Sequence, residues 1–196
     1  MVPPSVTVTR PLPRVERRAS ILRGAATAFS EGGFAATSMD SIAACAGVSK
    51  LIVYRHFDSK EELYRAVIEG VAGRLAEAFA DATGRGDPSE APARAFLAVA
   101  REDPQGFALL WRHSAREPQF AEYVERFRTL AAAFARSRLA PLLRDASLHE
   151  WAAETIVDVL VASVLHWLDR DDGSRDREFV VRAGRSLRAL VGAWAE

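Results

Sequence analysis

The sequence between residues 37 and 60 constrains the fold of this 196-residue chain more strongly than any other part of it. Ser38 stands where a helix N-cap is expected, because its hydroxyl can accept an amide N–H of the first turn. An apolar stripe at helical spacing follows, formed by Ile42, Ala43 and Ala46. Gly47 then marks the end of this helix, since glycine takes the left-handed conformation of a C-terminal turn without strain. The pattern predicts a short helix that ends in a tight turn.

A second short helix is predicted to follow directly, capped by Ser49 and extending over residues 50–57. At about 100° per residue, Val53 and Phe57 share one face and are expected to point into the core. The other side chains give an outward face that is both apolar and basic: Lys50, Leu51, Ile52, Tyr54 and Arg55. In the DNA major groove, apolar side chains can meet thymine methyl groups, and Arg or Lys can meet guanine edges. We interpret the two helices as a helix-turn-helix, with residues 50–57 as the recognition helix.

Two motifs in this region read Ile42-Ala43-x-x-Ala46-Gly47-Val48-Ser49-Lys50 and Tyr54-x-His56-Phe57-x-Ser59-Lys60-x-Glu62-Leu63. Together they closely resemble the signature of the TetR family of bacterial transcriptional repressors, and the resemblance covers about residues 14–70. It implies an all-α fold, with an N-terminal three-helix helix-turn-helix DNA-binding domain and a C-terminal helical regulatory and dimerisation domain. Members often carry Gly-Thr where this chain has Leu51-Ile52, so a polar DNA contact that is usual in the family is missing.

The outward face and the resemblance together predict the residues that contact DNA: Thr37, Ser38, Ser49, Lys50, Leu51, Ile52, Tyr54, Arg55, His56 and Lys60. Lys60 lies in the first turn of the next helix, where Ser59 and Glu62 have the spacing of a capping box. A cation there opposes the helix dipole, and a DNA phosphate at that point would explain it. The resemblance implies the same contact. His56 has two open interpretations, a phosphate contact or a packed core histidine.

Charge is distributed unevenly, although the formal net charge of the whole chain is zero. Residues 1–65 carry nine Lys or Arg against six Asp or Glu, a net +3. Residues 66–196 carry seventeen against twenty, a net −3. A basic module on an acidic body is typical of a protein that binds DNA through that module.

The single cysteine, Cys45, excludes an internal disulfide framework and agrees with a reducing compartment. We interpret Cys45 as a small packing residue of the first motif helix, with a redox-sensitive thiol as the alternative. The N-terminal residues lack the apolar core of a signal peptide, and no apolar run is expected to approach the length of a membrane span. The sequence therefore predicts a cytoplasmic protein with no membrane partner.

Three segments are predicted along the chain: a flexible arm over residues 1–13, a DNA-binding domain over 14–74, and an effector-binding and dimerisation domain over 75–196. The arm holds four prolines, and its Arg10, with Arg14 just after it, either reaches a DNA minor groove or belongs to a solvated tail. Residues 14–31 are expected to form a helix that supports the recognition helix and ends at Gly32-Gly33. Further helices are expected at residues 59–82, 92–102, 105–115, 118–144, 148–169 and 177–195.

Large aromatic residues are concentrated in the middle of the chain. Two interpretations stay open: a plain hydrophobic core, and a cavity for an apolar small molecule. The resemblance implies an effector pocket in this region. The predicted lining residues are Phe96, Phe107, Trp111, His113, Tyr123 and Phe127, with Arg112 as a further polar candidate.

The helix predicted over residues 148–169 is apolar around more than half of its circumference, so it must be covered on two sides. A partner subunit is a natural second cover, and the resemblance implies a two-fold homodimer built from the last two helices. The predicted interface residues are Ile156, Val159, Leu160, Val164, Trp167, Val180, Ala183, Leu187 and Val191. Such a dimer would place two recognition helices on a near-palindromic operator.

We find no catalytic constellation, metal-ligand cluster or cofactor motif in the sequence, so we expect neither an enzyme nor a bound metal or cofactor. The predicted function is that of a DNA-binding transcriptional regulator. Repression is the default, with release from the operator by a small apolar effector. The alternative is a small-molecule-binding or scaffolding protein of the same fold that has lost specific DNA binding, which only Leu51-Ile52 supports.

Overall fold

The structure is a computed structural model that describes residues 13–82, 87–113 and 117–196. Within these ranges the chain forms helices and connecting turns and no strand. The α-helices are α1 (Arg14–Ala36), α2 (Met39–Ala46), α3 (Lys50–Tyr54), α4 (Lys60–Ala82), α5 (Ala91–Glu102), α6 (Pro104–Ala108), α7 (Ala121–Leu139), α8 (His149–Leu168) and α9 (Asp176–Trp194). A π-helix, η1 (Leu109–His113), and two 3-10 helices, η3 (Pro118–Phe120) and η4 (Ala146–Leu148), complete the set. Arg10 and most of the predicted arm lie outside the described residues.

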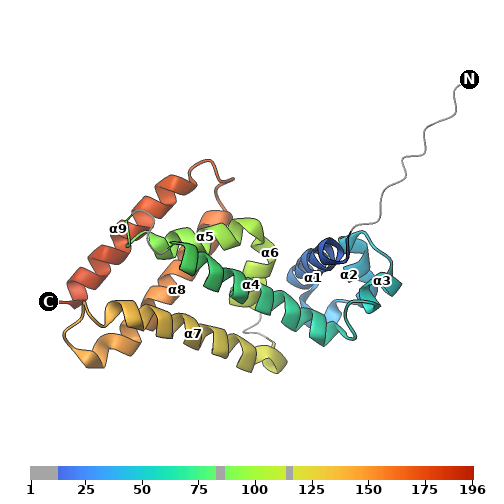
Figure 1. Cartoon of the computed structure of the whole chain (residues 1–196), viewed down its shortest axis with the longest axis horizontal. Coiled ribbons are helices and arrows are strands. Elements are labelled where there is room, and N and C mark those ends of the chain that lie inside the picture. Colours follow the sequence, from blue (N-terminus) through green and yellow to red (C-terminus); the bar gives the residue numbers. More distant parts are fainter. Residues whose placement is uncertain (1–12, 83–86, 114–116) are drawn as a thin grey trace, which may run out of the picture.

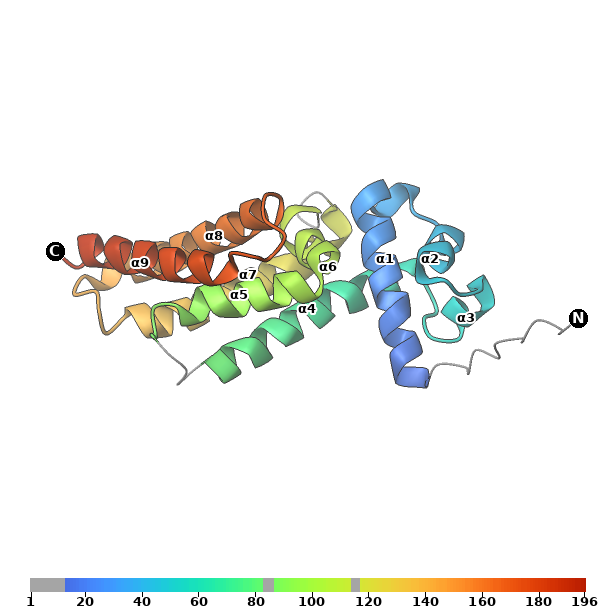
Figure 2. The same ribbon diagram turned by 90° about the horizontal axis from the view of Figure 1, so that it is seen from above.

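The helices form two parts, as Figures 1 and 2 show. Helices α1 to α3 make a small module at one end of the molecule, and α4 runs from this module into the body. Helices α5 to α9 make up the rest of the body, with α8 packed against both α5 and α7. The predicted all-α architecture, with an N-terminal helix-turn-helix module and a C-terminal helical body, is confirmed.

Helix α1 bends near its end instead of stopping there. Gly33 has φ 72° and ψ 169°, which no helical residue adopts, and a last short turn continues to Ala36. Glycine tolerates this positive φ because it has no Cβ. The bend turns the next residue, Phe34, into the core, where it is only 8% exposed. The sequence predicted that the helix ends at Gly32-Gly33. The interruption lies at the predicted position, but the helix continues beyond it to Ala36.

Helix α2 has the predicted caps at both of its ends. The Ser38 hydroxyl accepts the backbone N–H of Ser41 at 3.1 Å, and the Ser41 hydroxyl accepts the N–H of Ser38 at 3.0 Å. Gly47 ends α2 in the left-handed conformation, with φ 65°. These reciprocal hydrogen bonds satisfy N–H groups that a helix start leaves without a partner, so α2 starts and stops where the sequence predicts.

Helix α4 also begins with a capping arrangement, although not quite the predicted one. The Ser59 hydroxyl accepts the N–H of Glu62 at 3.0 Å, as expected. The Glu62 carboxylate, however, accepts the N–H of Asp58 at 2.6 Å, one residue before the cap. The carboxylate still lies near the N-terminus of α4, where the helix dipole favours a negative charge.

Helix α8 corrects one sequence prediction. Residues Ala146–Leu168 are long and apolar enough, by length and composition alone, to cross a membrane, although no such run was expected. In this structure α8 lies among α5, α7 and α9, and 44% of its apolar window is buried inside the chain. The remaining apolar surface of α8 is not covered by the described residues of its own chain.

Candidate DNA-binding site

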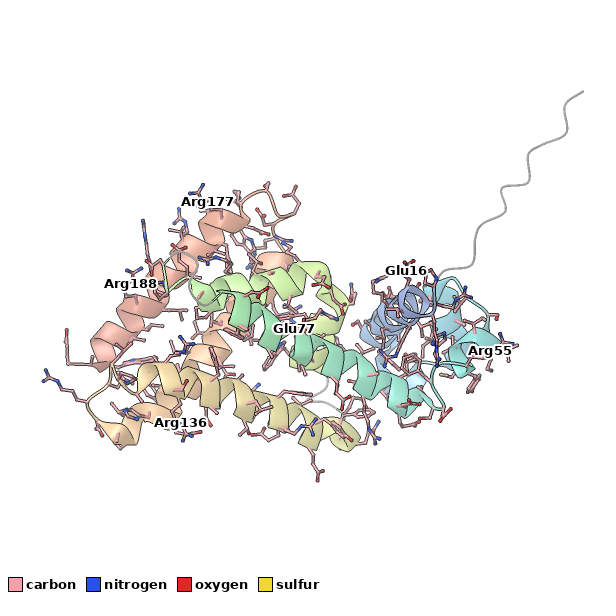
Figure 3. All side chains as sticks on the ribbon, in the orientation of Figure 1. Glu16, Arg55, Glu77, Arg136, Arg177 and Arg188 are labelled. Atoms are coloured by element: carbon pink, nitrogen blue, oxygen red, sulfur yellow. The ribbon has the colours of Figure 1, made fainter. Side chains whose placement is uncertain are left out.

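Helix α3 presents the outward face that the sequence predicts. Val53 and Phe57 are buried in the module, whereas Leu51 is 61% exposed, Tyr54 is 46% exposed and Arg55 is exposed. Figure 3 shows Arg55 at the end of the molecule farthest from Arg188 of α9. The α-helix ends at Tyr54 instead of reaching residue 57. Residues 55–57 continue it as a hydrogen-bonded turn, in which their N–H groups donate to carbonyl oxygens of α3.

At the start of α3, two side chains predicted to contact DNA already have partners within the protein. Ser49 occupies the N-cap position, but its hydroxyl makes no capping hydrogen bond. The Lys50 ammonium donates to the Asp40 carboxylate of α2 at 2.7 Å, and this hydrogen bond raises the pKa of Lys50. Ile52 is half-buried against the core. The side chains that project most openly from α3 are therefore Leu51, Tyr54 and Arg55.

Two of the predicted DNA contacts are hydroxyls already engaged within the module. Thr37 is only 5% exposed, and its Oγ1 donates to the carbonyl oxygens of Gly33, at 2.6 Å, and Ala28, at 3.0 Å. The Thr37 hydroxyl thus closes the end of α1, and the contact of Thr37 with DNA stays a prediction. Ser38 is exposed, although its hydroxyl is used in the α2 cap.

Lys60 has a partner that the sequence did not reveal. Its Nζ donates to the carbonyl oxygens of Phe34, at 2.8 Å, and Thr37, at 2.9 Å, and lies 4.3 Å from the centre of the Phe34 ring. These carbonyls belong to the C-terminal end of α1, which carries a partial negative charge. A cation in the first turn of α4 is thus explained by α1, without a phosphate.

A cluster of positive charge lies beside His56. This histidine is half-buried, and burial lowers its pKa, with Arg14, Arg17 and Arg18 of α1 lowering it further. The Arg18 guanidinium also lies 5.0 Å from the centre of the Phe57 ring, which fixes the start of α1 next to the recognition helix. From the sequence, Arg14 was expected either to reach a DNA minor groove or to belong to a solvated tail, and Arg17 and Arg18 either to contact phosphates or to lie on a solvated face. The clustering follows from the packing of the start of α1 beside His56 and Phe57, which helical periodicity cannot reveal.

Cys45 lies on the surface of α2, in contrast to its interpretation as a packing residue. The neighbouring residues Ile42 and Ala43 fill the inner face of α2, and Cys45 falls on the opposite side of the helix. A short helix of small residues does not distinguish an inward cysteine from an outward one by composition.

The six predicted effector-pocket residues lie on α5, α6, η1 and α7. Phe96, Phe107 and Trp111 pack together, with ring centres 6.1 to 6.4 Å apart. Tyr123 and Phe127 lie on α7, half-buried against the same core, with the Arg126 guanidinium over both rings. His113 is half-buried at the end of η1. Among the described residues the buried indole N–H of Trp111 has no hydrogen-bond partner.

Most of the predicted dimer residues are covered by their own chain. The buried ones are Ile156, Leu160, Val164, Val180 and Leu187. The half-buried ones are Val159, Trp167, Ala183 and Val191. Periodicity identified the apolar faces of α8 and α9 correctly, but α5 and α7 already cover much of them.

A recognition helix exposed on a small basic three-helix module, carried by a helical body, defines a helix-turn-helix DNA-binding protein. Residues 21–67 match the family model described as bacterial regulatory proteins, tetR family. The HTH-type transcriptional activator FasR of Mycolicibacterium smegmatis is 36% identical over 170 residues, which cover 82% of this chain and 76% of FasR. The HTH-type transcriptional repressor KstR2 of Rhodococcus jostii is 34% identical over 86 residues, 44% of this chain and 42% of KstR2.

A solved TetR-like transcriptional regulator from Rhodococcus sp. RHA1 superposes with a TM-score of 0.73 at 26% identity, covering 93% of this chain and 97% of that one. The chain therefore belongs to the TetR family of bacterial transcriptional regulators. This is a family of DNA-binding regulators and not a family of enzymes.

Proposed function

We propose that this protein is a homodimeric, ligand-responsive transcriptional repressor that binds a near-palindromic operator in the bacterial cytoplasm. The observation that carries the proposal is the face of α3, where Leu51, Tyr54 and Arg55 are exposed on a basic module. This combination suits the DNA major groove, where apolar side chains can meet thymine methyl groups and an arginine can meet a guanine edge. The DNA-binding domain would extend over residues 14–74 and the regulatory domain over 75–196, with the boundary inside α4.

In this proposal, the exposed residues of α3, Leu51, Tyr54 and Arg55, contact the base edges directly. Leu51 is suited to thymine methyl groups, and Arg55 is suited to a guanine edge or a phosphate. The arginines at the start of α1 supply sequence-independent attraction to the DNA backbone. Because Leu51-Ile52 replaces the Gly-Thr that is frequent in the family, the operator is expected to be read largely through apolar contacts at this point.

The dimer is proposed to use the outer faces of α8 and α9. On α8 these residues are Thr155, Val159, Ala162 and His166. On α9 they are Ser186, Ala189, Gly192 and Ala193. They are mostly small, which lets helices approach closely, and a Cβ atom placed on Gly192 would meet nothing within 4 Å. A second copy would cover the apolar surface of α8 that its own chain leaves open.

The effector site is proposed to lie next to Phe96, Phe107 and Trp111. A buried indole N–H without a partner costs free energy unless something accepts its hydrogen bond. An apolar molecule with one acceptor oxygen would satisfy it. By linkage, an effector that weakens operator binding must itself be bound more weakly by the operator-bound protein, by the same factor.

Activation is the second candidate for the direction of regulation. It is favoured by one observation, the similarity over most of the chain to FasR, whose name describes it as an activator. Both directions use the same operator binding, so they differ in the position of the operator relative to the promoter. In vitro transcription from the bound promoter distinguishes them.

The test is a gel-shift titration of the full-length protein with DNA from the promoter beside its own gene, over a series of salt concentrations. Tight binding to a near-palindrome with a steep salt dependence is expected, because several phosphates are contacted. Tyr54→Ala and Arg55→Ala should weaken binding, while Arg177→Ala, a matched exposed arginine on α9, should not. Equally weak binding to every sequence, confirmed by selection from a random DNA pool, would support the alternative of a regulator fold that has lost its DNA specificity.

A further inference from the structure

The bend at Gly33 is held from outside the module. After Gly33 the helix starts a new turn, so the N–H of Phe34 needs an acceptor from elsewhere. That acceptor is the Glu117 carboxylate, which receives the Phe34 N–H at 3.1 Å. Glu117 directly precedes η3 in the body, 83 residues further along the chain. The body therefore completes the backbone hydrogen bonding of the DNA-binding module at the bend.

The same bend is also held by an aromatic side chain of the body. Phe120, at the end of η3, is fully buried, with its ring centre 4.9 Å from that of Phe34 and 4.1 Å from that of Tyr64 in α4. Tyr64 in turn meets Phe29 of α1 at 4.9 Å. One aromatic cluster thus joins α1, α4 and the segment before α7. Ring contacts of this kind stabilise a defined relative orientation, because edge and face arrangements depend on the angle between the rings.

A third contact lies one turn earlier on α1. The Ser30 hydroxyl donates to the carbonyl oxygen of Gln105 in α6 at 3.2 Å. Figure 2 shows this end of α1 lying against α6 and the part of the body that precedes α7. We call Gln105, Glu117 and Phe120 the α1 anchor.

These contacts change how the module is attached to the body. Helix α4 alone would be a single connection, about which the module could rotate. The α1 anchor is a second connection that is far from α4 in sequence and meets the module on α1. Two separate connections fix an orientation that one does not.

We propose that Glu117 and Phe120 are positioning residues for DNA binding, which hold the recognition helix at one orientation relative to the body. They do not touch DNA themselves. Through the anchor, any rearrangement of Glu117 and η3 is transmitted to α1 directly and not only along α4. The inference rests on the proposed DNA-binding function for its biological meaning, but the orientation itself can be measured without DNA.

The chain supplies its own probe for this measurement. Cys45 is the only cysteine and is exposed on α2, so a spin label reacts with the module at one place. A second label on a Thr129→Cys substitution, at an exposed position of α7, reports the body. Pulsed dipolar spectroscopy on labelled protein diluted with unlabelled protein gives the distance between the two labels within one chain, whatever the oligomeric state.

The expected result is a single narrow distance peak in the doubly labelled parent protein. Glu117→Ala and Phe120→Ala should lose that single peak in favour of a broad or shifted distribution. Glu117→Gln should keep it, because the amide oxygen can still accept the Phe34 N–H. Glu122→Ala, which removes an exposed carboxylate close by on α7, should also keep it.

An unchanged narrow peak in Glu117→Ala and in a folded Phe120→Ala protein overturns the proposal. If Phe120→Ala fails to fold, as judged by its circular dichroism, the comparison of Glu117→Ala with Glu117→Gln decides the matter. A gel shift with the unlabelled parent protein is scored separately. Its failure would refute the proposed operator binding and leave the distance result standing, and the reverse also holds.

Discussion

The ammonium group of Lys50, the first residue of the recognition helix α3, lies 2.7 Å from the carboxylate of Asp40 on α2. Both side chains are largely exposed, at 48% and 69%, so water screens the pair and it adds little to stability. The Lys50–Asp40 pair matters instead for DNA binding. The carboxylate occupies a lysine that the DNA backbone would otherwise attract, and it brings a negative charge close to the reading surface.

Asp40→Asn should therefore strengthen binding to DNA of every sequence. The freed Lys50 can pair with a phosphate, which steepens the plot of log affinity against log salt concentration by about 0.9. Gel-shift titrations at several salt concentrations, on operator and unrelated DNA, measure this change. Glu122→Gln on α7 serves as the control for a simple change of net charge. Equal affinities and slopes for Asp40→Asn and the parent protein would show that Lys50 does not reach the DNA.

Lys60→Met should lower the stability of the DNA-binding module. The substitution keeps an apolar stem but leaves the carbonyls of Phe34 and Thr37 without their charged donor, at a cost of about 1.5–3 kcal/mol for a hydrogen bond to a charged group. Urea unfolding followed by circular dichroism measures the loss. The phosphate contact that the family resemblance implies remains a separate prediction. If that is the main role of Lys60, the variant would keep its stability and lose only DNA affinity and salt dependence.

His56 should make the protein less stable in mildly acidic solution. Burial and three arginines lower its pKa in the folded state, so the unfolded chain binds more protons in the interval below the ordinary pKa of about 6.5. Stability from this residue is complete above about pH 6.5 and decreases as the pH falls towards the folded pKa. Urea midpoints at pH 7.5 and 5.5 should differ more for the parent than for His56→Gln. A difference of the same size in both proteins would assign the pH effect to other groups.

Ala162→Glu should prevent dimerisation. Position 162 lies at the centre of the proposed outer face of α8, where a buried charge without a partner is strongly unfavourable. Sedimentation velocity should show a dimer for the parent protein and a monomer for the variant, which should also lose affinity for the full operator. Ala133→Glu, the same change at an exposed site on α7, should leave the dimer intact. A dimeric Ala162→Glu protein would place the interface elsewhere.

Gly24→Ala should destabilise the module by about 1–3 kcal/mol, the usual cost of overpacking. A Cβ atom on Gly24 would lie 2.5 Å from the backbone nitrogen of Ala46 and 2.6 Å from its Cα, so α1 and α2 would have to move apart. The matched control is Gly73→Ala in α4, where a Cβ atom would meet nothing within 4 Å. That change should stabilise the protein by about 0.5–1 kcal/mol, because alanine favours helix interiors over glycine. Urea unfolding compares the two directly.

The features predicted correctly from the sequence are those set by near neighbours in the chain. Ser38, Gly47 and Ser59 cap or end their helices through groups three or four residues away, so their roles can be read locally. The inward positions of Val53 and Phe57 follow from helical periodicity in the same way. Such signals are enough to define the helix-turn-helix and its exposed face.

The features that were missed depend on contacts between distant segments. The carbonyl partners of Lys60 were missed because the end of α1 cannot be placed beside it from sequence. The close approach at Gly24 and the hydrogen bond of Glu117 to the bend in α1 are equally invisible to periodicity. For α8, the apolar pattern reveals how much surface needs cover, but not whether α5, α7 or another subunit supplies it.

Helix α4 also acts as a mechanical lever. It contains 23 residues, which at a rise of about 1.5 Å per residue gives a rod about 35 Å long. A tilt of only about 5° at the body end would move the other end by about 3 Å, close to the rise of about 3.4 Å between successive base pairs of one DNA strand. A rearrangement in the body too small to alter any helix would thus shift the DNA-binding module, with its recognition helix α3, by almost the length of one base-pair step along the operator.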